Sequence, residues 1–253
     1  MIHVLRAAAV AFAVFAIGVP AASAQSVTPE QRSEFETIIR DYLVSNPEVI
    51  EEAIAALQKK RADAEDAERA ATISKNSDLL FNSTRQVVLG NPKGDVTLVE
   101  FFDYNCGYCK RAFKDMVRLL HEDSNLRIVL KEFPVLGQGS AEAAQVAIAV
   151  KMTDEAKYAA FHQEMLTMKG RADRAASLKA AEKAGLDIDA VTKNMESDEV
   201  SATIEEVYAM ANDLGLTGTP SYVVGNEVLV GAVGYDQLKS KIKSIRACGE
   251  TSC

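Results

Sequence analysis

Apolar residues recur at helical spacing in two short stretches near the start of the chain. Thr28-Pro29-Glu30-Gln31 has the pattern of a helix cap with proline in the first turn, and Asn46-Pro47 should separate this helix from a second one. Each predicted helix carries one apolar stripe, formed by Phe35, Ile38, Ile39, Tyr42 and Leu43 in the first and by Val49, Ile50, Ile54 and Leu57 in the second.

Two short helices offer little surface against which these stripes can be buried, and a helical hairpin of this size is rarely stable alone. The stripes must therefore dock either on the rest of the same chain or on the same segment of another copy. Their spacing favours the second arrangement. We expect residues 25–82 to be an N-terminal helical association segment that makes the chain a homo-oligomer through residues 28–80.

The pattern changes at residue 86 to short apolar runs separated by turns. Strands are predicted at 86–90, 96–104 and 126–134, because these runs are rich in Val, Leu, Ile and Phe. Between the second and third strands the apolar positions recur as on one face of a helix, at Cys109, Ala112, Phe113, Met116, Val117 and Leu120. These runs predict a strand–helix–strand unit.

An Ala-rich block with helical periodicity follows over about residues 141–214. A hairpin is predicted at 221–230 and a closing helix at 234–246. This order predicts an α/β domain over residues 83–247 with a large helical insertion. A tail with two cysteines follows at 248–253.

The first 24 residues have the pattern of a secretory signal peptide. One Arg precedes an apolar run from Ala7 to Val19, and Ala22-Ser23-Ala24 provides a cleavage site. The apolar run is shorter than the ~20 residues that a membrane-spanning helix needs. We therefore expect residues 1–24 to be cleaved and the protein to be periplasmic.

The chain is acidic, with 28 Lys and Arg against 36 Asp and Glu. One of those cations and none of the acids lies in residues 1–24, so the remainder has a net charge of −9. Such a charge argues against nucleic acid and anionic membranes as general partners. No cofactor is expected.

Cys106-Gly107-Tyr108-Cys109 is the strongest chemical signal. Two cysteines three residues apart at a helix start lie on the same face, close enough to form a disulfide. The unpaired N–H groups of the first turn favour an anion, which lowers the pKa of the first thiol. We expect Cys106 to be the attacking thiolate and Cys109 the resolving thiol.

Two other interpretations of this pair are weaker. Half of a zinc site would need further ligands, and His121 and His162 lack metal-ligand spacing, so no metal site is predicted. A purely structural disulfide would close too small a loop to stabilise the fold much.

Glu100 is a charged residue inside the apolar run 98–102. Burial would raise the pKa of its carboxyl group, which makes it a candidate proton acceptor for Cys109. Lys131 on the neighbouring predicted strand is a candidate partner for Glu100. The alternative is that Glu100 faces water at a sheet edge.

Taken together, Val99-Glu100-Phe101-Phe102, the Cys106–Cys109 motif, the helical block and Gly218-Thr219-Pro220 resemble the DsbA-like branch of the thioredoxin superfamily. The resemblance covers residues 85–247 and implies a thioredoxin-like fold with a helical insertion. It also implies that Thr219 and a cis Pro220 border the cysteine pair and, with Gly107 and Tyr108, contact substrate. Its N-terminal segment is similar to that of ScsC-type (suppressor of copper sensitivity) proteins, in some of which this segment serves oligomerisation.

The resemblance favours a disulfide isomerase or reductase over a dithiol oxidase. Gly107-Tyr108 stands where the strong oxidase has Pro-His, and Thr219 where it has Val. Without an imidazolium beside the thiolate, the reduced state should be less favoured and the pair less oxidising. The implied partners are disulfide-containing client proteins and a membrane thiol reductase, or an oxidase in the alternative case. A copper- or zinc-binding protein or a chaperone of the envelope is the alternative of another class.

Cys248 and Cys253 end the chain. In an oxidising compartment they would most simply form a small disulfide. Metal capture and thiol relay to the Cys106 pair are the other interpretations.

Overall fold

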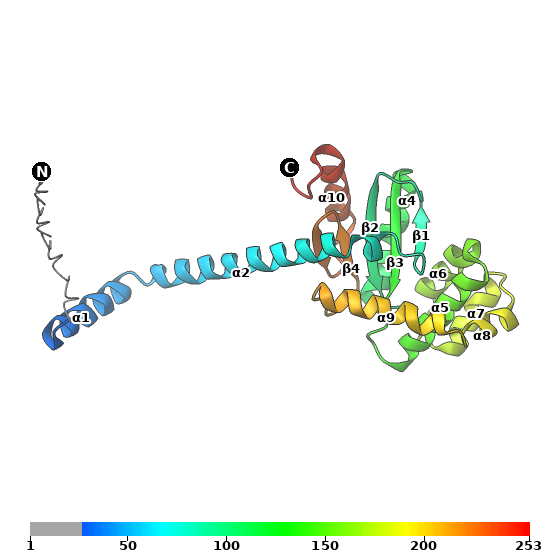
Figure 1. Ribbon diagram of the computed structural model, residues 1–253, viewed down its shortest axis with the longest axis horizontal. Helices are drawn as coiled ribbons and strands as arrows, with labels where there is room; N and C mark the ends of the chain where they lie inside the picture. Colours follow the sequence, from blue (N-terminus) through cyan, green and yellow to red (C-terminus); the bar gives the residue numbers. More distant parts are fainter. Residues whose placement is uncertain (1–26) are drawn as a thin grey trace, which may run out of the picture. The chain divides into compact units, whose positions relative to one another are not determined.

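The computed structural model describes residues 27–253 (Figure 1). The predicted signal peptide lies outside them. The chain divides into two units, Met1–Gln58 and Lys59–Cys253. Within the described residues, no helix has both the length and the apolar character required to cross a bilayer.

The first unit contains α1 (Pro29–Ser45) and the beginning of α2 (Glu48–Lys75). Thr28 caps α1 by accepting a hydrogen bond from the Gln31 N–H, and the Gln31 side chain accepts one from the Thr28 N–H at 3.0 Å. None of the residues in α1 is buried. Its apolar stripe is exposed, with Phe35, Ile38, Ile39 and Tyr42 each more than half accessible.

The second unit is built on a five-stranded sheet in the order β1-β3-β2-β4-β5. The two central strands, β2 and β3, are parallel, and the other neighbouring pairs are antiparallel. The strand bounds are β1 Val87–Gly90, β2 Val96–Phe102, β3 Leu126–Glu132, β4 Ser221–Val224 and β5 Glu227–Val230. β2 and β3 are buried along nearly their whole length, as continuous apolar runs require.

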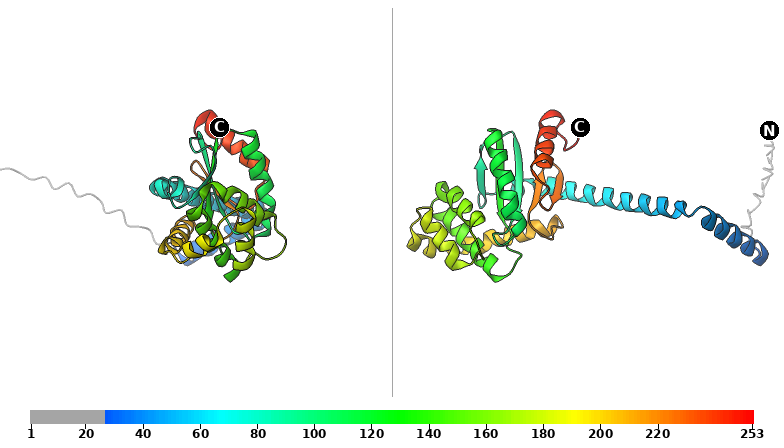
Figure 2. Two further views of the ribbon diagram at one scale, coloured as in Figure 1. Left: turned by 90° about the vertical axis from the view of Figure 1, so that its right-hand side faces the viewer. Right: turned by 180° about the vertical axis from the view of Figure 1, so that it is seen from behind.

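Helices cover both faces of this sheet. One face packs on α4 (Gly107–Glu122), α10 (Tyr235–Cys248) and the insertion. The other packs on α3 (Ser77–Phe81), the end of α2 and α9. The insertion contains α5 Gln138–Thr153, a 3-10 turn Glu155–Lys157, α6 Tyr158–Thr167, α7 Arg174–Lys183, α8 Ile188–Asn194 and α9 Asp198–Asp213. Helices α5 to α8 form a block beside the sheet, and α9 extends from this block along the sheet (Figures 1 and 2). The predicted α/β architecture with a helical insertion is confirmed.

The boundary between the two units differs from the one predicted at residue 82. The structure places it after Gln58, inside α2. Ile73 of α2 and Leu80 of α3 explain the difference, because they are 3% and 0% exposed and belong to the apolar layer beneath the sheet. The second half of α2 and α3 are therefore parts of the larger unit.

Candidate active site

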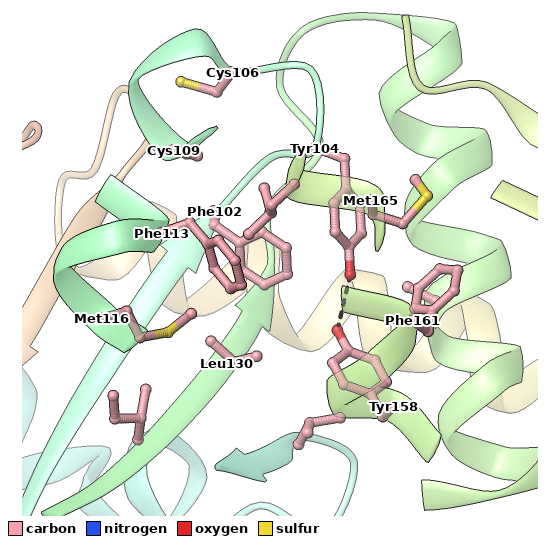
Figure 3. Close-up of a cluster of buried hydrophobic side chains, with 14 of the residues drawn as sticks. Phe102, Tyr104, Cys106, Cys109, Phe113, Met116, Leu130, Tyr158, Phe161 and Met165 are labelled. Atoms are coloured by element: carbon pink, nitrogen blue, oxygen red, sulfur yellow. Dashed lines mark hydrogen bonds between the residues drawn. The ribbon is translucent and has the colours of Figure 1, made fainter. Parts of the chain in front are cut away.

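The cysteine pair lies at the start of α4, just after the loop that follows β2 (Figure 3). The connecting loop is fixed by Asp103, whose carboxylate accepts the N–H of Asn105 at 2.7 Å and that of Leu136 at 3.0 Å. Cys106 is the N-cap residue of α4 and has extended backbone angles, and its carbonyl accepts the N–H of Lys110. Its sulfur is therefore held at the end of the helix that carries unpaired N–H groups.

Hydrogen bonds to its sulfur lower the pKa of Cys106 from 9.0 to about 5. The largest contribution comes from the thiol of Cys109, followed by the Thr219 side chain and the N–H groups of Cys109 and Tyr108, while burial acts in the opposite direction. In its protonated form, the thiol donates to the Thr219 carbonyl at 3.1 Å. Cys106 is accordingly a thiolate at neutral pH.

Cys109 lies one helical turn further along and is only 1% exposed. Four causes raise the pKa of its thiol: the hydrogen bond with Cys106, burial, the negative charge of Glu100 and the charge of Cys106. Both cysteines are free thiols in the structure. The two thiols thus differ chiefly in acidity, as an attacking and a resolving thiol must, and less in exposure, since Cys106 is itself only 6% exposed.

Glu100 is buried within β2 and is 4% exposed. Burial is the main cause that raises the pKa of its carboxyl from 4.5 to about 7, and the charge of Cys106 adds to it. The Tyr222 hydroxyl donates to the carboxylate at 3.3 Å and partly offsets this effect. A buried carboxyl with a pKa near 7 can accept or return a proton at physiological pH.

The predicted partner of Glu100 was wrong. In the parallel register Glu100 lies opposite Leu130, whereas Lys131 lies opposite Phe101, so the two side chains point to opposite faces of the sheet. Lys131 instead donates to the Leu79 carbonyl at 3.0 Å. Burial lowers the pKa of its amine to about 8, while the charge of Glu206 raises it. Lys131 is part of the layer beneath the sheet rather than of the site.

The loop before β4 borders the pair on the other side. Its Thr219-Pro220 peptide bond is cis. The hydrogen bond from Cys106 to the Thr219 carbonyl places this residue against the sulfur. Of the dipeptide between the cysteines, Gly107 and Tyr108 are exposed, and the Tyr108 side chain is 60% accessible.

Asn105 is a residue that the sequence analysis did not single out. Its side chain donates to the Ala172 carbonyl at 2.8 Å and to Ser140 at 3.0 Å, and it accepts the Ala172 N–H at 2.7 Å. These bonds join the loop before the pair to two segments of the insertion. A polar residue just before Cys106 was the only local signal, and its partners lie 35 and 67 residues away.

A buried polar network includes Tyr104 and Tyr158, whose hydroxyl groups face each other in Figure 3. Tyr158 donates to Glu132 at 2.6 Å, and the Tyr104 hydroxyl lies 3.2 Å from that of Tyr158 and 3.0 Å from Nδ1 of His162. Burial raises the pKa of Glu132 well above its usual range and lowers that of His162 to about 3. Neutral groups in these positions can be buried because they bond to one another, although Nε2 of His162 is buried without a hydrogen-bond partner among the described residues.

The tail is closed by a disulfide between Cys248 and Cys253. Arg246, which precedes this disulfide in the sequence, donates hydrogen bonds to Asp95 at 2.7 Å and to Asp123 at 3.0 Å. Asp95 precedes β2 and Asp123 follows α4, whereas Cys106 lies at the opposite ends of both elements. Cys109 lies in the first turn of the 16-residue helix α4, so about 20 Å of helix separates the two cysteine pairs, which argues against direct thiol relay within one chain. In the described part of the chain, no three His, Cys, Asp or Glu residues are grouped as metal ligands would be.

Comparison with known families gives two matches. Residues 97–243 match the model of the DSBA-like thioredoxin domain. Residues 31–64 match that of the copper resistance protein ScsC N-terminal domain.

Solved structures agree with these matches. A thioredoxin-like oxidoreductase from Silicibacter pomeroyi DSS-3 is 43% identical and aligns over 68% of this chain and 98% of its own, with a TM-score of 0.65. Proteus mirabilis ScsC in a transitional conformation is 33% identical and aligns over 88% of this chain and 98% of its own, also with a TM-score of 0.65.

Curated relatives are more distant. Disulfide bond formation protein D of Bacillus subtilis is 24% identical over 173 residues, which are 62% of this chain and 76% of that protein. The chain spans only 24% of the length of the first two curated relatives it matches, which are Na⁺/H⁺ antiporters of Salinispora.

Proposed function

The chain belongs to the DSBA-like thioredoxin family of thiol–disulfide oxidoreductases, and we propose that it is a periplasmic protein disulfide isomerase or reductase working through Cys106 and Cys109. The observation that carries the proposal is the acidic, hydrogen-bonded thiol of Cys106 beside a deeply buried second thiol. A thiolate is the attacking species in disulfide exchange, and the second thiol provides an exit from the mixed disulfide.

The proposed reaction begins when the Cys106 thiolate attacks one sulfur of a client disulfide. A mixed disulfide forms, and the other client sulfur leaves as a thiolate. In isomerisation, a client thiolate then attacks a different client sulfur, and a later exchange releases Cys106 unchanged. In reduction, Cys109 passes its proton to Glu100 and attacks the Cys106 sulfur, which releases the client thiol and leaves a Cys106–Cys109 disulfide. A membrane thiol reductase would restore the dithiol.

The groups that stabilise the Cys106 thiolate set how strongly the pair oxidises or reduces a client. The Cys106 thiolate is stabilised by hydrogen bonds from the Cys109 thiol, from backbone N–H groups and from the Thr219 side chain. The dipeptide Gly107-Tyr108 contains no histidine, so no imidazolium lies beside the thiolate. The reduced state should therefore be less favoured than in a strong oxidase, which suits an enzyme that starts reduced. A dithiol oxidase is the runner-up.

Refolding of a protein with scrambled disulfides tests this direction. The reduced chain should restore the native disulfides of the scrambled protein, whereas the oxidised chain should not. An oxidase would show the converse, by forming disulfides in a fully reduced client from its own oxidised state. Activity of the oxidised chain alone would contradict the isomerase proposal.

We also propose that the chain associates into a homo-oligomer through residues 28–58, the part of the predicted segment 28–80 that lies outside the larger unit. The exposed apolar stripe of α1 and the match of this segment to the ScsC N-terminal domain support it. Several thiolates held near one client would increase the effective concentration of each. The match to a copper resistance protein also supports a role in copper tolerance.

Light scattering measures this association. The full chain should have a mass of several copies, and Ile39→Glu should reduce it toward one copy because it places a charge on the stripe. Arg40→Glu is the matched control, since it changes the adjacent residue outside the stripe and should leave the mass unchanged. A monomeric full chain would contradict the proposal.

A further inference from the structure

Four segments converge on the cysteine pair, and hydrogen bonds tie them together. Segment 104–111 contains the pair itself, and segment 134–140 is attached to it through Asp103 and Asn105. Segment 168–172 is bound by Asn105 and by Lys110, whose amine donates to the Gly170 carbonyl at 3.2 Å. Segment 217–221 contacts the Cys106 sulfur through Thr219.

These four segments together have a net charge of +4, whereas the chain as a whole is acidic. They contain four cations and no Asp or Glu, in a chain that has more acids than bases overall. We call the four cations the cationic frame: Lys110, Arg111, Lys169 and Arg171. Three carboxylates that flank these segments in sequence already have partners: Asp103 accepts two backbone N–H groups, Asp173 caps α7, and Glu142 accepts from Gln138 and from the Arg174 N–H. Glu100 is buried within β2 and is not part of the exposed surface.

Three side chains of the frame, those of Lys110, Arg111 and Arg171, have defined contacts near the pair. The Arg111 guanidinium lies 4.2 Å from the centre of the exposed Tyr108 ring, so a cation stands beside the dipeptide that separates the cysteines. Lys110 holds the loop on which Lys169 and Arg171 are exposed. Arg171 lies across Gly139 at the start of α5, where an added Cβ would come within 2.8 Å of its Nε. The absence of a side chain at Gly139 thus makes room for Arg171.

We infer that the cationic frame selects client segments in which acidic residues flank the cysteine under attack. This inference rests on the proposed function, because it names the clients of the same site. Opposite charge raises the rate of encounter and disfavours basic segments. Tyr108, Val135 and Leu136 are exposed within the same surface and offer apolar contacts. An acidic segment carrying an apolar residue therefore matches the surface best.

Three cyclic peptides test the inference. Each has the same length and one disulfide, and its flanking residues are glutamate, serine or lysine. The reduced full chain is mixed with each peptide, and thiols are alkylated at intervals and counted by mass spectrometry. We expect the glutamate peptide to be reduced about tenfold faster than the lysine peptide at low salt. The ratio should approach one in 1 M salt, where charges are screened beyond about 3 Å.

Charge reversal provides the decisive comparison. The triple variant Arg111→Glu, Lys169→Glu and Arg171→Glu should invert the ratio, whereas Lys93→Glu, Lys193→Glu and Lys243→Glu make the same change in net charge away from the site and should preserve it. The ratio of the two peptide reduction rates does not depend on what fraction of a variant is folded and active, because both rates are measured on the same protein. Equal reduction of all three peptides, or an equal response of both variants, would overturn the inference alone. Reduction of none of them by the wild-type chain would overturn the proposed function.

Discussion

Replacing Cys106 by serine is expected to lower the rate of insulin disulfide reduction at pH 7 by at least about a thousandfold, because a hydroxyl cannot replace a thiolate as nucleophile. The wild-type thiol has a pKa of about 5 and is ionised at this pH. Cys109 cannot take over the attack, since it is 1% exposed and the pKa of its thiol is raised. Precipitation of the insulin B chain gives the rate.

Cys109→Ser is the matched control for this loss. It retains the Cys106 nucleophile but removes the resolving thiol, so a mixed disulfide between Cys106 and the client should accumulate and be visible on a non-reducing gel. Its formation should still be rapid at pH 7, although the loss of the Cys109 hydrogen bond raises the pKa of Cys106. Retention of insulin reduction by Cys106→Ser would remove the basis of the proposed mechanism.

Periodicity and turn residues were sufficient to predict most of the larger unit. The apolar runs at β2 and β3 indicated buried central strands, and the spacing after Cys106 indicated most of the buried face of α4. Val117 is the exception, because it was predicted on that face and is 47% exposed. Both depend on local patterns, which a sequence displays directly. The position of the two cysteines at a helix start was likewise readable, and with it the low pKa of Cys106.

Contacts between segments that are far apart in the sequence could not be predicted. The pairing of Glu100 with Lys131 failed because a parallel register cannot be derived from two strands considered separately, and a shift of one residue exchanges the faces. Asn105 was missed because its partners belong to the insertion. The boundary between the units was placed too late, since nothing local shows that Ile73 and Leu80 reach the sheet.

Replacing Glu100 by glutamine is expected to slow the resolution of the mixed disulfide on the order of a hundredfold, the usual contribution of a proton acceptor. Attack by Cys106 should continue, because Glu100 takes no part in that step. The measurement is the decay of a preformed mixed disulfide after rapid mixing, followed by acid quench and gel. Unchanged decay between pH 7 and 8 would exclude Glu100 as the acceptor for Cys109.

Stability gives an independent test of the same carboxyl group. Its pKa is about 7 in the folded chain against 4.5 ordinarily, so the folded state retains a proton that the unfolded state releases between these pH values. The free energy of unfolding therefore falls as pH rises from 4.5 to 7, by at most about 3 kcal/mol. Urea unfolding of the reduced protein should find Glu100→Gln more stable than wild type at pH 8 and equally stable at pH 4. Glu182→Gln changes an exposed glutamate and is the control, which should show no such difference. If the free energy of unfolding of Glu100→Gln depends on pH in the same way as that of wild type, the Glu100 carboxyl is not held protonated by burial.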